Sequence, residues 1–293
     1  MPSRLKRKDN LAALPLVAPF VVVYAALFLY PSLQMLLMSF TNSQLTLPGE
    51  WVGLDNYVKL LSDRKFGTAL VNTLYFVLMT VIPGTLIGLG LALLVNRLKG
   101  AWQAIALAVF FVPYILPVST VTTIATFLTA PGDGPLGGLV RLPNGDPMWL
   151  WRNITLFLPG VAVITIWWTV GFNVLIFLAG LRALPQELYE AAKLDGATGW
   201  ARFWSLTWPL IWPVTALVLT LQLILQIKVF DQVFLMIFGG RTDPTMVLVQ
   251  YIYTVAFQRN QGGYASAVAV GLFVVVTVVA VLQFQLLRVR SAK

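Results

Sequence analysis

Residues 153–181 read NITLFLPGVAVITIWWTVGFNVLIFLAGL, a stretch without Lys, Arg, Asp or Glu. A helix needs about 20 predominantly apolar residues to cross the hydrocarbon layer of a membrane, so this stretch is long enough to span it. Hydrophobic residues make up 58% of the whole chain and charged residues only 11%. Soluble domains are usually about 45–50% apolar and about 25% charged. The sequence therefore predicts an all-α integral membrane protein and excludes an ordinary soluble domain.

Five further windows are long and apolar enough to cross a membrane, and only one of them, the fifth in chain order, contains charged residues. The six helices are expected near residues 11–36, 68–95, 103–129, 155–181, 207–237 and 264–287. We expect residues 1–293 to form one transmembrane domain. Within it, a first helix and outer loop occupy 11–65, and a core occupies about 68–287.

Lys and Arg are distributed unevenly between the two sides that six spans define. The richer side has twelve of them: Arg4, Lys6, Arg7, Lys8, Arg97, Lys99, Arg182, Lys193, Arg202, Arg288, Arg290 and Lys293. The other side has seven: Lys59, Arg64, Lys65, Arg141, Arg152, Arg241 and Arg259. Lys and Arg accumulate in the short cytoplasmic loops of membrane proteins, so both chain ends are expected in the cytoplasm. The net charge of +9 thus indicates orientation and not a nucleic-acid partner.

The connection between the fourth and fifth windows is the one inner loop long enough to form structure of its own. From Leu184 to Phe203 it reads LPQELYEAAKLDGATGWARF. Pro185 suits the first position of a helix, and Gly196 suits the left-handed turn that closes one. The pattern predicts a short amphipathic cytoplasmic helix that lies on lipid headgroups or docks a partner protein. Helices of the first kind usually carry Lys and Arg, whereas this one begins with acidic residues.

Around this helix the spacing of small residues is distinctive. Glu190-Ala191-Ala192 is followed after three residues by Gly196, and after nine more by Leu206-Thr207-Trp208-Pro209. This spacing resembles the cytoplasmic EAA loop of ABC importer permeases, although relatives usually have Leu where Trp208 stands. In that family the loop forms a coupling helix that fits a cleft on the ATPase subunit. The resemblance implies that ATPase coupling involves Glu190, Ala191, Ala192, Asp195, Gly196 and Ala197.

Shorter motifs extend the resemblance over nearly the whole chain. They are Leu29-Tyr30-Pro31, Met38-Ser39-Phe40-Thr41, Val52 to Tyr57, Asn72-Thr73, Val112-Pro113 with Pro117, and Lys228 to Gln232. Together they resemble the first permease subunit of the maltose and glycerol-3-phosphate importers. The resemblance implies a type I ABC importer permease fold with six transmembrane helices. It also implies a sugar-like solute, a second homologous permease, two ATPase subunits and an extracytoplasmic solute-binding protein.

Uncharged polar side chains form two stripes within the fourth and fifth helices. Thr165, Thr169 and Asn173 are four residues apart, as are Gln222 and Gln226, so each set shares a helix face. Polar groups in hydrocarbon need partners, so both stripes should face the bundle interior, where they line a solute path or bond helices together. The resemblance to maltose importers implies a substrate pathway lined by Thr165, Trp168, Thr169, Phe172, Gln222, Leu225 and Gln226.

Lys228 and Asp231 are the charged residues within a predicted span. At this spacing in a continuous helix the two side chains share a face and partly neutralise each other. Intramembrane charges of this kind serve a solute contact or a gate, or they anchor and pack a helix near the outer interface. The position of Lys228 far along the fifth helix favours an anchoring ion pair.

Residues that the chain lacks limit its chemistry. It has no Cys and no His, which excludes disulfides, Cys/His metal sites and His-based catalysis. It has no Gly-x-x-x-x-Gly-Lys-Ser/Thr sequence, so ATP and Mg²⁺ are expected on separate ATPase subunits. The expected protein is therefore a non-enzymatic permease subunit without a cofactor or metal, in the cytoplasmic membrane of a bacterium or archaeon. An ATP-independent solute carrier is the alternative.

Overall fold

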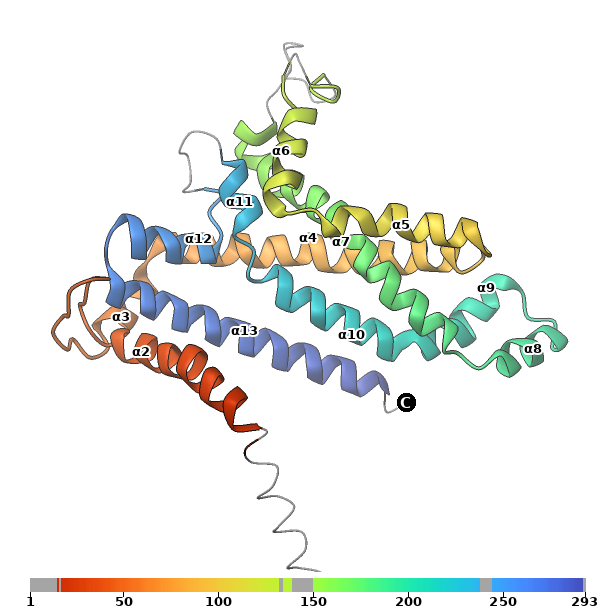
Figure 1. The fold of residues 1–293 in the computed structure, drawn as a ribbon, viewed down its shortest axis with the longest axis horizontal. Helices are drawn as coiled ribbons and strands as arrows, with labels where there is room; N and C mark the ends of the chain where they lie inside the picture. The colour runs from red at the N-terminus through yellow and green to blue at the C-terminus, as the bar shows by residue number, and fades with distance from the viewer. Residues whose placement is uncertain (1–14, 16, 132–133, 139–149, 238–243, 292–293) are drawn as a thin grey trace, which may run out of the picture. The chain divides into compact units, whose positions relative to one another are not determined.

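The computed structural model describes residues 15, 17–131, 134–138, 150–237 and 244–291 (Figure 1). Within these ranges most residues are helical, and the extended pairing is limited to an isolated antiparallel bridge between Thr41 and Trp51. Five helices are long and apolar enough to cross a membrane, and a bent helix pair, counted as one broken span, makes the sixth. The structure thus confirms the expected all-α, six-span architecture.

The spans have the following bounds. The first is Val17–Met38, which includes η1 (Ala25–Leu29) and α2 (Tyr30–Met38). The second is α4 (Arg64–Val95), the third combines α5 (Ala101–Ile115) and α6 (Val118–Leu128), and the fourth is α7 (Ile154–Arg182). The fifth, Gly199–Gln226, comprises α9 (Gly199–Arg202), η3 (Phe203–Thr207) and α10 (Trp208–Gln226), and the sixth, Gly262–Gln285, lies within α13 (Gly262–Ser291). Shorter helices are α3 (Asp55–Ser62), η2 (Leu150–Arg152), α8 (Gln186–Leu194), α11 (Asp231–Met236), α12 (Leu248–Tyr253) and η4 (Thr254–Gln258). The expected start of the first span at residue 11 lies outside the described residues.

Two spans differ from the sequence prediction. The single helix expected near 103–129 is wrong, because two helices, α5 and α6, occupy this range and the chain bends by 100° between them. Leu116 has extended backbone (ψ 138°) before Pro117, as expected for a residue that precedes proline. The expected helix at 207–237 is also wrong, because it starts earlier, at Gly199, and α10 ends at Gln226.

The chain divides into two compact units, of which the smaller comprises residues up to 63 together with 252–272. In this unit the loop after α2 is tied to α3. The Asn56 side-chain amide donates to the carbonyls of Ser39 and Thr41 at 2.9 and 2.8 Å, and the Ser39 and Tyr57 hydroxyls are 2.6 Å apart. Gly53, just before α3, has a left-handed φ of +59°. These motif residues therefore have structural roles.

The larger unit comprises residues 64–251 and 273–293. In it α7 packs against α4, α5 and α10 (Figure 1). Helix association in lipid depends on close packing and hydrogen bonds, because lipid tails are as apolar as the side chains. The contact of α7 with α5 shows this closeness, since a Cβ at Gly171 would lie 2.0 Å from the Phe110 carbonyl oxygen. Only glycine fits there.

Candidate functional site

Helix α8 follows the fourth span and ends in a glycine turn. Gly196 has φ +74°, and its N–H donates to the Lys193 carbonyl at 3.1 Å. The Ala197 N–H donates to the Ala192 carbonyl at 3.0 Å, which completes the hydrogen-bond pair of a Schellman motif. The prediction that Gly196 closes this helix is confirmed. Pro185 lies one position earlier than predicted, at the N-cap.

The surface of α8 is accessible along the whole helix, because none of its residues is buried. Leu194 is 89% exposed, and the acidic side chains of Glu190 and Asp195 are exposed too. The Tyr189 hydroxyl donates to the Thr207 hydroxyl at 3.0 Å, and this hydrogen bond links the helix to the start of the fifth span. The helix therefore presents a surface with an apolar residue among acidic ones.

The six residues that the resemblance assigns to ATPase coupling lie together on α8 and its closing turn. Four of them are exposed: Glu190, Ala191, Asp195 and Gly196. Ala192 and Ala197 are half-buried and supply the carbonyl and N–H that close the turn. The structure thus places the predicted coupling residues in one accessible segment.

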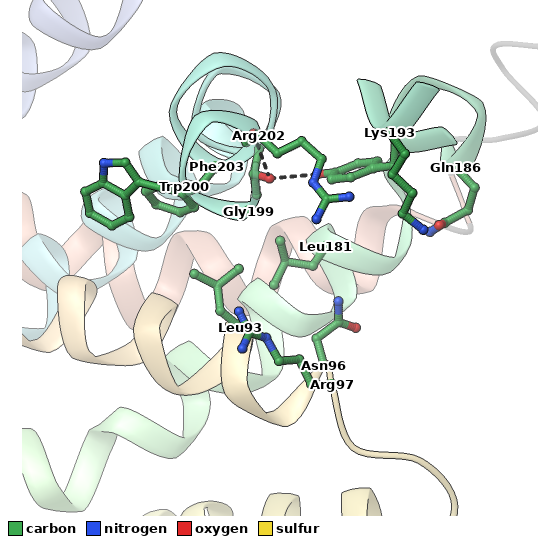
Figure 2. A pocket seen from close by; sticks show the side chains of 12 residues that line it. Leu93, Asn96, Arg97, Leu181, Gln186, Lys193, Gly199, Trp200, Arg202 and Phe203 are labelled. Atoms are coloured by element: carbon green, nitrogen blue, oxygen red, sulfur yellow. Dashed lines mark hydrogen bonds between the residues drawn. The ribbon is translucent and has the colours of Figure 1, made fainter. Parts of the chain in front are cut away.

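A cavity of about 750 Å³ lies between α8, the ends of α4 and α7, and the α9–η3 segment (Figure 2). Arg97, Lys193 and Arg202 line it, together with the hydrogen-bonded Tyr189 and Thr207. Among the described residues that line it, none is Asp or Glu. The cavity is therefore positively charged.

The two predicted polar stripes meet between α4, α7 and α10. The Asn173 side-chain amide donates to the Gly84 carbonyl at 3.1 Å, and its oxygen accepts from Gln222 at 2.6 Å. The Gln222 oxygen in turn accepts from Gln226 at 3.1 Å. All three side chains are at most 4% exposed. Asn173, Gln222 and Gln226 thus form an interhelical chain of hydrogen bonds. Of the two roles that the sequence allows, lining a solute path or bonding helices together, this is the second.

The predicted aromatic residues on α7 face the break in the third span. The Trp168 indole N–H donates to the Leu116 carbonyl at 3.2 Å, which satisfies a backbone group beside the break. Phe172 stacks on Tyr114, with ring centroids 5.1 Å apart. Both predicted residues are half-buried, so each keeps part of its ring accessible.

The remaining predicted pathway residues differ in burial. Thr165 is fully buried, and within the described residues its hydroxyl has no hydrogen-bond partner. Thr169 is half-buried, and its hydroxyl donates to the Thr165 carbonyl one turn earlier at 2.8 Å. Leu225 is 46% exposed. A solute would therefore meet Thr169 and Leu225 more readily than the buried Thr165.

Lys228 and Asp231 do not form the predicted intramembrane ion pair. Lys228 follows the end of α10, and Asp231 begins the separate helix α11, so the two share no helix face. Both side chains are exposed, and among the described residues no salt bridge joins them. The prediction assumed a continuous helix, and the break at residues 227–230 removes that assumption.

A family model described as "Binding-protein-dependent transport system inner membrane component" matches residues 84–290. The match includes α8, the basic cavity and the polar chain. The protein belongs to this family. It is therefore an inner membrane component of a transport system that works with a binding protein.

Known proteins are similar to this member of the family over most of their length. The multiple sugar-binding transport system permease protein MsmF of Streptococcus mutans is 32% identical over 92% of this chain and 93% of its own. The arabinooligosaccharides transport system permease protein AraP of Bacillus subtilis is 32% identical over 92% and 86%. A bacterial ABC transporter that imports alginate shares the fold, with a TM-score of 0.83 and 24% identity over 97% of this chain and 96% of that chain.

Sequence reasoning did not assign roles to Asn72 and Thr73 beyond the family motif. The Asn72 amide donates to the carbonyls of Pro244 and Met246, both at 2.9 Å. The Thr73 hydroxyl accepts from the Leu248 N–H at 2.8 Å. These bonds attach the start of α4 to the segment that leads into α12. The sequence feature that could have indicated these hydrogen bonds is a pair of polar residues, Asn72 and Thr73, near the start of a predicted span.

Proposed function

We propose that this chain is the permease subunit of an ABC importer that carries a sugar or similar polar solute. The observation that carries the proposal is the exposed α8, whose acidic and apolar surface and Schellman turn suit docking into a protein cleft. Relatives named as permeases for multiple sugars and for arabinooligosaccharides support the solute class. We further propose that residues 1–293 act as one permease domain.

The proposed assembly contains a second homologous permease, two ATPase subunits and an extracytoplasmic solute-binding protein. A related alginate transporter was solved in complex with an alginate pentasaccharide-bound periplasmic protein, which supports the last partner. ATP and Mg²⁺ bind the ATPase subunits, which supply the hydrolysis. The excess of Lys and Arg on the side of α8 supports a cytoplasmic position for α8 and both chain ends.

In the proposed mechanism α8 transmits movement from the ATPase to the transmembrane helices. The hydrogen bond between Tyr189 and Thr207 links α8 to the π-helical start of the fifth span, so displacement of α8 pulls on that span. The chain of bonds from Gln226 through Asn173 to the Gly84 carbonyl then carries the movement to α4 and α7. The solute passes the accessible side chains of Trp168, Thr169, Phe172 and Leu225.

Co-purification tests the docking role of α8. The tagged chain should bring an ABC ATPase out of the membrane, and Leu194→Arg should reduce the bound ATPase several-fold by placing a charge in the apolar contact. Leu61→Arg on α3 is the matched control, because Leu61 is 87% exposed and Leu194 is 89% exposed. Equal ATPase recovery from both variants would contradict the proposal.

Solute affinity tests the pathway. Thr169→Val removes a half-buried hydroxyl that bonds within its own helix, so it should weaken solute binding several-fold at an unchanged Tm. Gln226→Leu breaks the interhelical chain and should lower the Tm. A Thr169→Val complex with unaltered solute affinity would remove Thr169 from the pathway.

A further inference from the structure

The cavity beside α8 has a chemistry that the docking role of α8 does not use. Arg97 comes from the turn after α4, Lys193 from the last turn of α8, and Arg202 from the end of α9. Figure 2 shows Arg202 directed toward Leu181, with Lys193 on the α8 side and Arg97 on the α4 side. Three separate segments thus bring three cations to one space.

Within the described part of the chain these cations have no anionic partner. Among the described residues no salt bridge or side-chain hydrogen bond involves Arg97, Lys193 or Arg202, and no carboxylate lines the cavity. Like charges held near one another repel, so an arrangement of this kind is stabilised by a bound anion. Arg and Lys are the side chains that bind phosphate, Arg through two parallel N–H donors.

The rest of the lining indicates that the anion carries an apolar part. Leu93 and Phe203 form part of the wall, and Trp200 lies at the same cavity with 73% of its surface exposed. Tryptophan is enriched at the level of lipid headgroups, where its ring is apolar and its N–H is polar. A free inorganic anion contacts only the basic side chains of the lining, whereas a phospholipid contacts the basic side chains with its phosphate and the apolar ones with its acyl chains.

We propose that this cavity binds the phosphate of an anionic phospholipid headgroup, with Arg97, Lys193 and Arg202 around the phosphate and the acyl chains leaving past Leu93 and Trp200. Basic pockets between membrane helices on the cytoplasmic side bind lipid headgroups in this way. The inference rests on the proposed orientation, which places the cavity at the cytoplasmic leaflet. A lipid bound here contacts α8 and the start of the fifth span, so it stabilises the segment that receives the ATPase.

Native mass spectrometry of the delipidated complex tests the site. The complex is incubated with phosphatidylglycerol or phosphatidylcholine and the retained lipid is counted. Phosphatidylglycerol should be retained preferentially, and Arg97→Gln or Arg202→Gln should each weaken its retention about fivefold. Lys99→Gln is the matched control, because Lys99 lies two residues from Arg97 and does not line the cavity. Arg97→Lys keeps the charge and should preserve binding.

Three results would overturn the proposal: equal retention of the two lipids, equal retention by Arg97→Gln and Lys99→Gln, or complete displacement of phosphatidylglycerol by millimolar inorganic phosphate. The last result would assign the cavity to a free anion. Arg97 is exposed, and a Tm measurement on each variant shows that its fold is intact. Because bound lipid is measured in detergent without transport, failure of this test is distinguishable from failure of the proposed transport function.

Discussion

Asn173 connects three helices with one side chain. It is 1% exposed, donates to the Gly84 carbonyl on α4 and accepts from Gln222 on α10. A buried polar group without a partner costs about 1–3 kcal/mol, so each member of this chain depends on its neighbours. The sequence predicted that both stripes face the bundle interior, but a pattern of side chains does not reveal that the partner on α4 is a backbone carbonyl.

Replacing Gln222 with Leu should lower the stability of the purified protein by about 1–3 kcal/mol, because Asn173 and Gln226 each lose a buried partner. The Tm in detergent measures this loss. Gln285→Leu on α13 is the control, since Gln285 is exposed and the change should leave the Tm nearly unaltered. Equal effects of the two substitutions on the Tm would mean that the hydrogen bonds of Gln222 contribute nothing to the stability of the protein.

Gly88 and Gly90 offer a second test at this scale. A Cβ at Gly88 would lie 2.6 Å from the Asn173 Cβ, whereas no atom lies within 4 Å of one at Gly90. Gly88→Ala should therefore lower the Tm. Gly90→Ala should maintain or raise it, because alanine favours a helix by about 1 kcal/mol over glycine. A Gly88→Ala protein as stable as Gly90→Ala would argue against the close packing of α4 on α7.

At the level of elements, the breaks in two spans decide the geometry of the helix bundle. Hydropathy locates a span but does not show whether its helix bends, so the 100° bend at Leu116 was not predicted although Pro117 was noted. Nothing in residues 227–230 forbids a helix. Val229, Val233 and Met236 are buried in a cluster with residues of α6 and α7, so tertiary packing sets the end of α10.

By contrast, the end of α8 was predictable, because a left-handed turn requires a residue such as Gly196. Gly196→Val should strain this turn by about 1–2 kcal/mol and displace the α8 surface, so that ATP hydrolysis by the complex no longer drives uptake. The ratio of solute imported to ATP hydrolysed measures coupling.

Gly53→Val is the control for this substitution, since Gly53 has φ +59° and equally open surroundings but precedes α3. It should lower stability and leave the ratio unchanged. Coupling that survives Gly196→Val, or fails equally in both variants, would contradict the role of α8.

For the whole molecule, the uneven distribution of Lys and Arg predicts the orientation in the membrane. Successive spans cross in opposite directions, so alternate loops lie on opposite sides. The chain has no Cys, so single cysteines report position without interference. Ser62→Cys, at the end of α3, should react with an impermeant thiol reagent in intact cells, and Ser291→Cys should react only after the membrane is permeabilised. Labelling in the opposite order would reverse the topology and place α8 away from the cytoplasmic ATPase.

The central claim is that this chain forms the path of an ATP-driven importer. The most direct test is whether transport depends on ATP. Proteoliposomes are prepared with the complete complex and its loaded binding protein, and separately with this chain alone, and solute uptake is measured with ATP or a non-hydrolysable analogue on the side of α8. We predict concentrative uptake by the complete complex with ATP, and none with the analogue or with the chain alone. Uptake by the chain alone, driven only by the solute gradient, would identify an ATP-independent carrier and contradict the account.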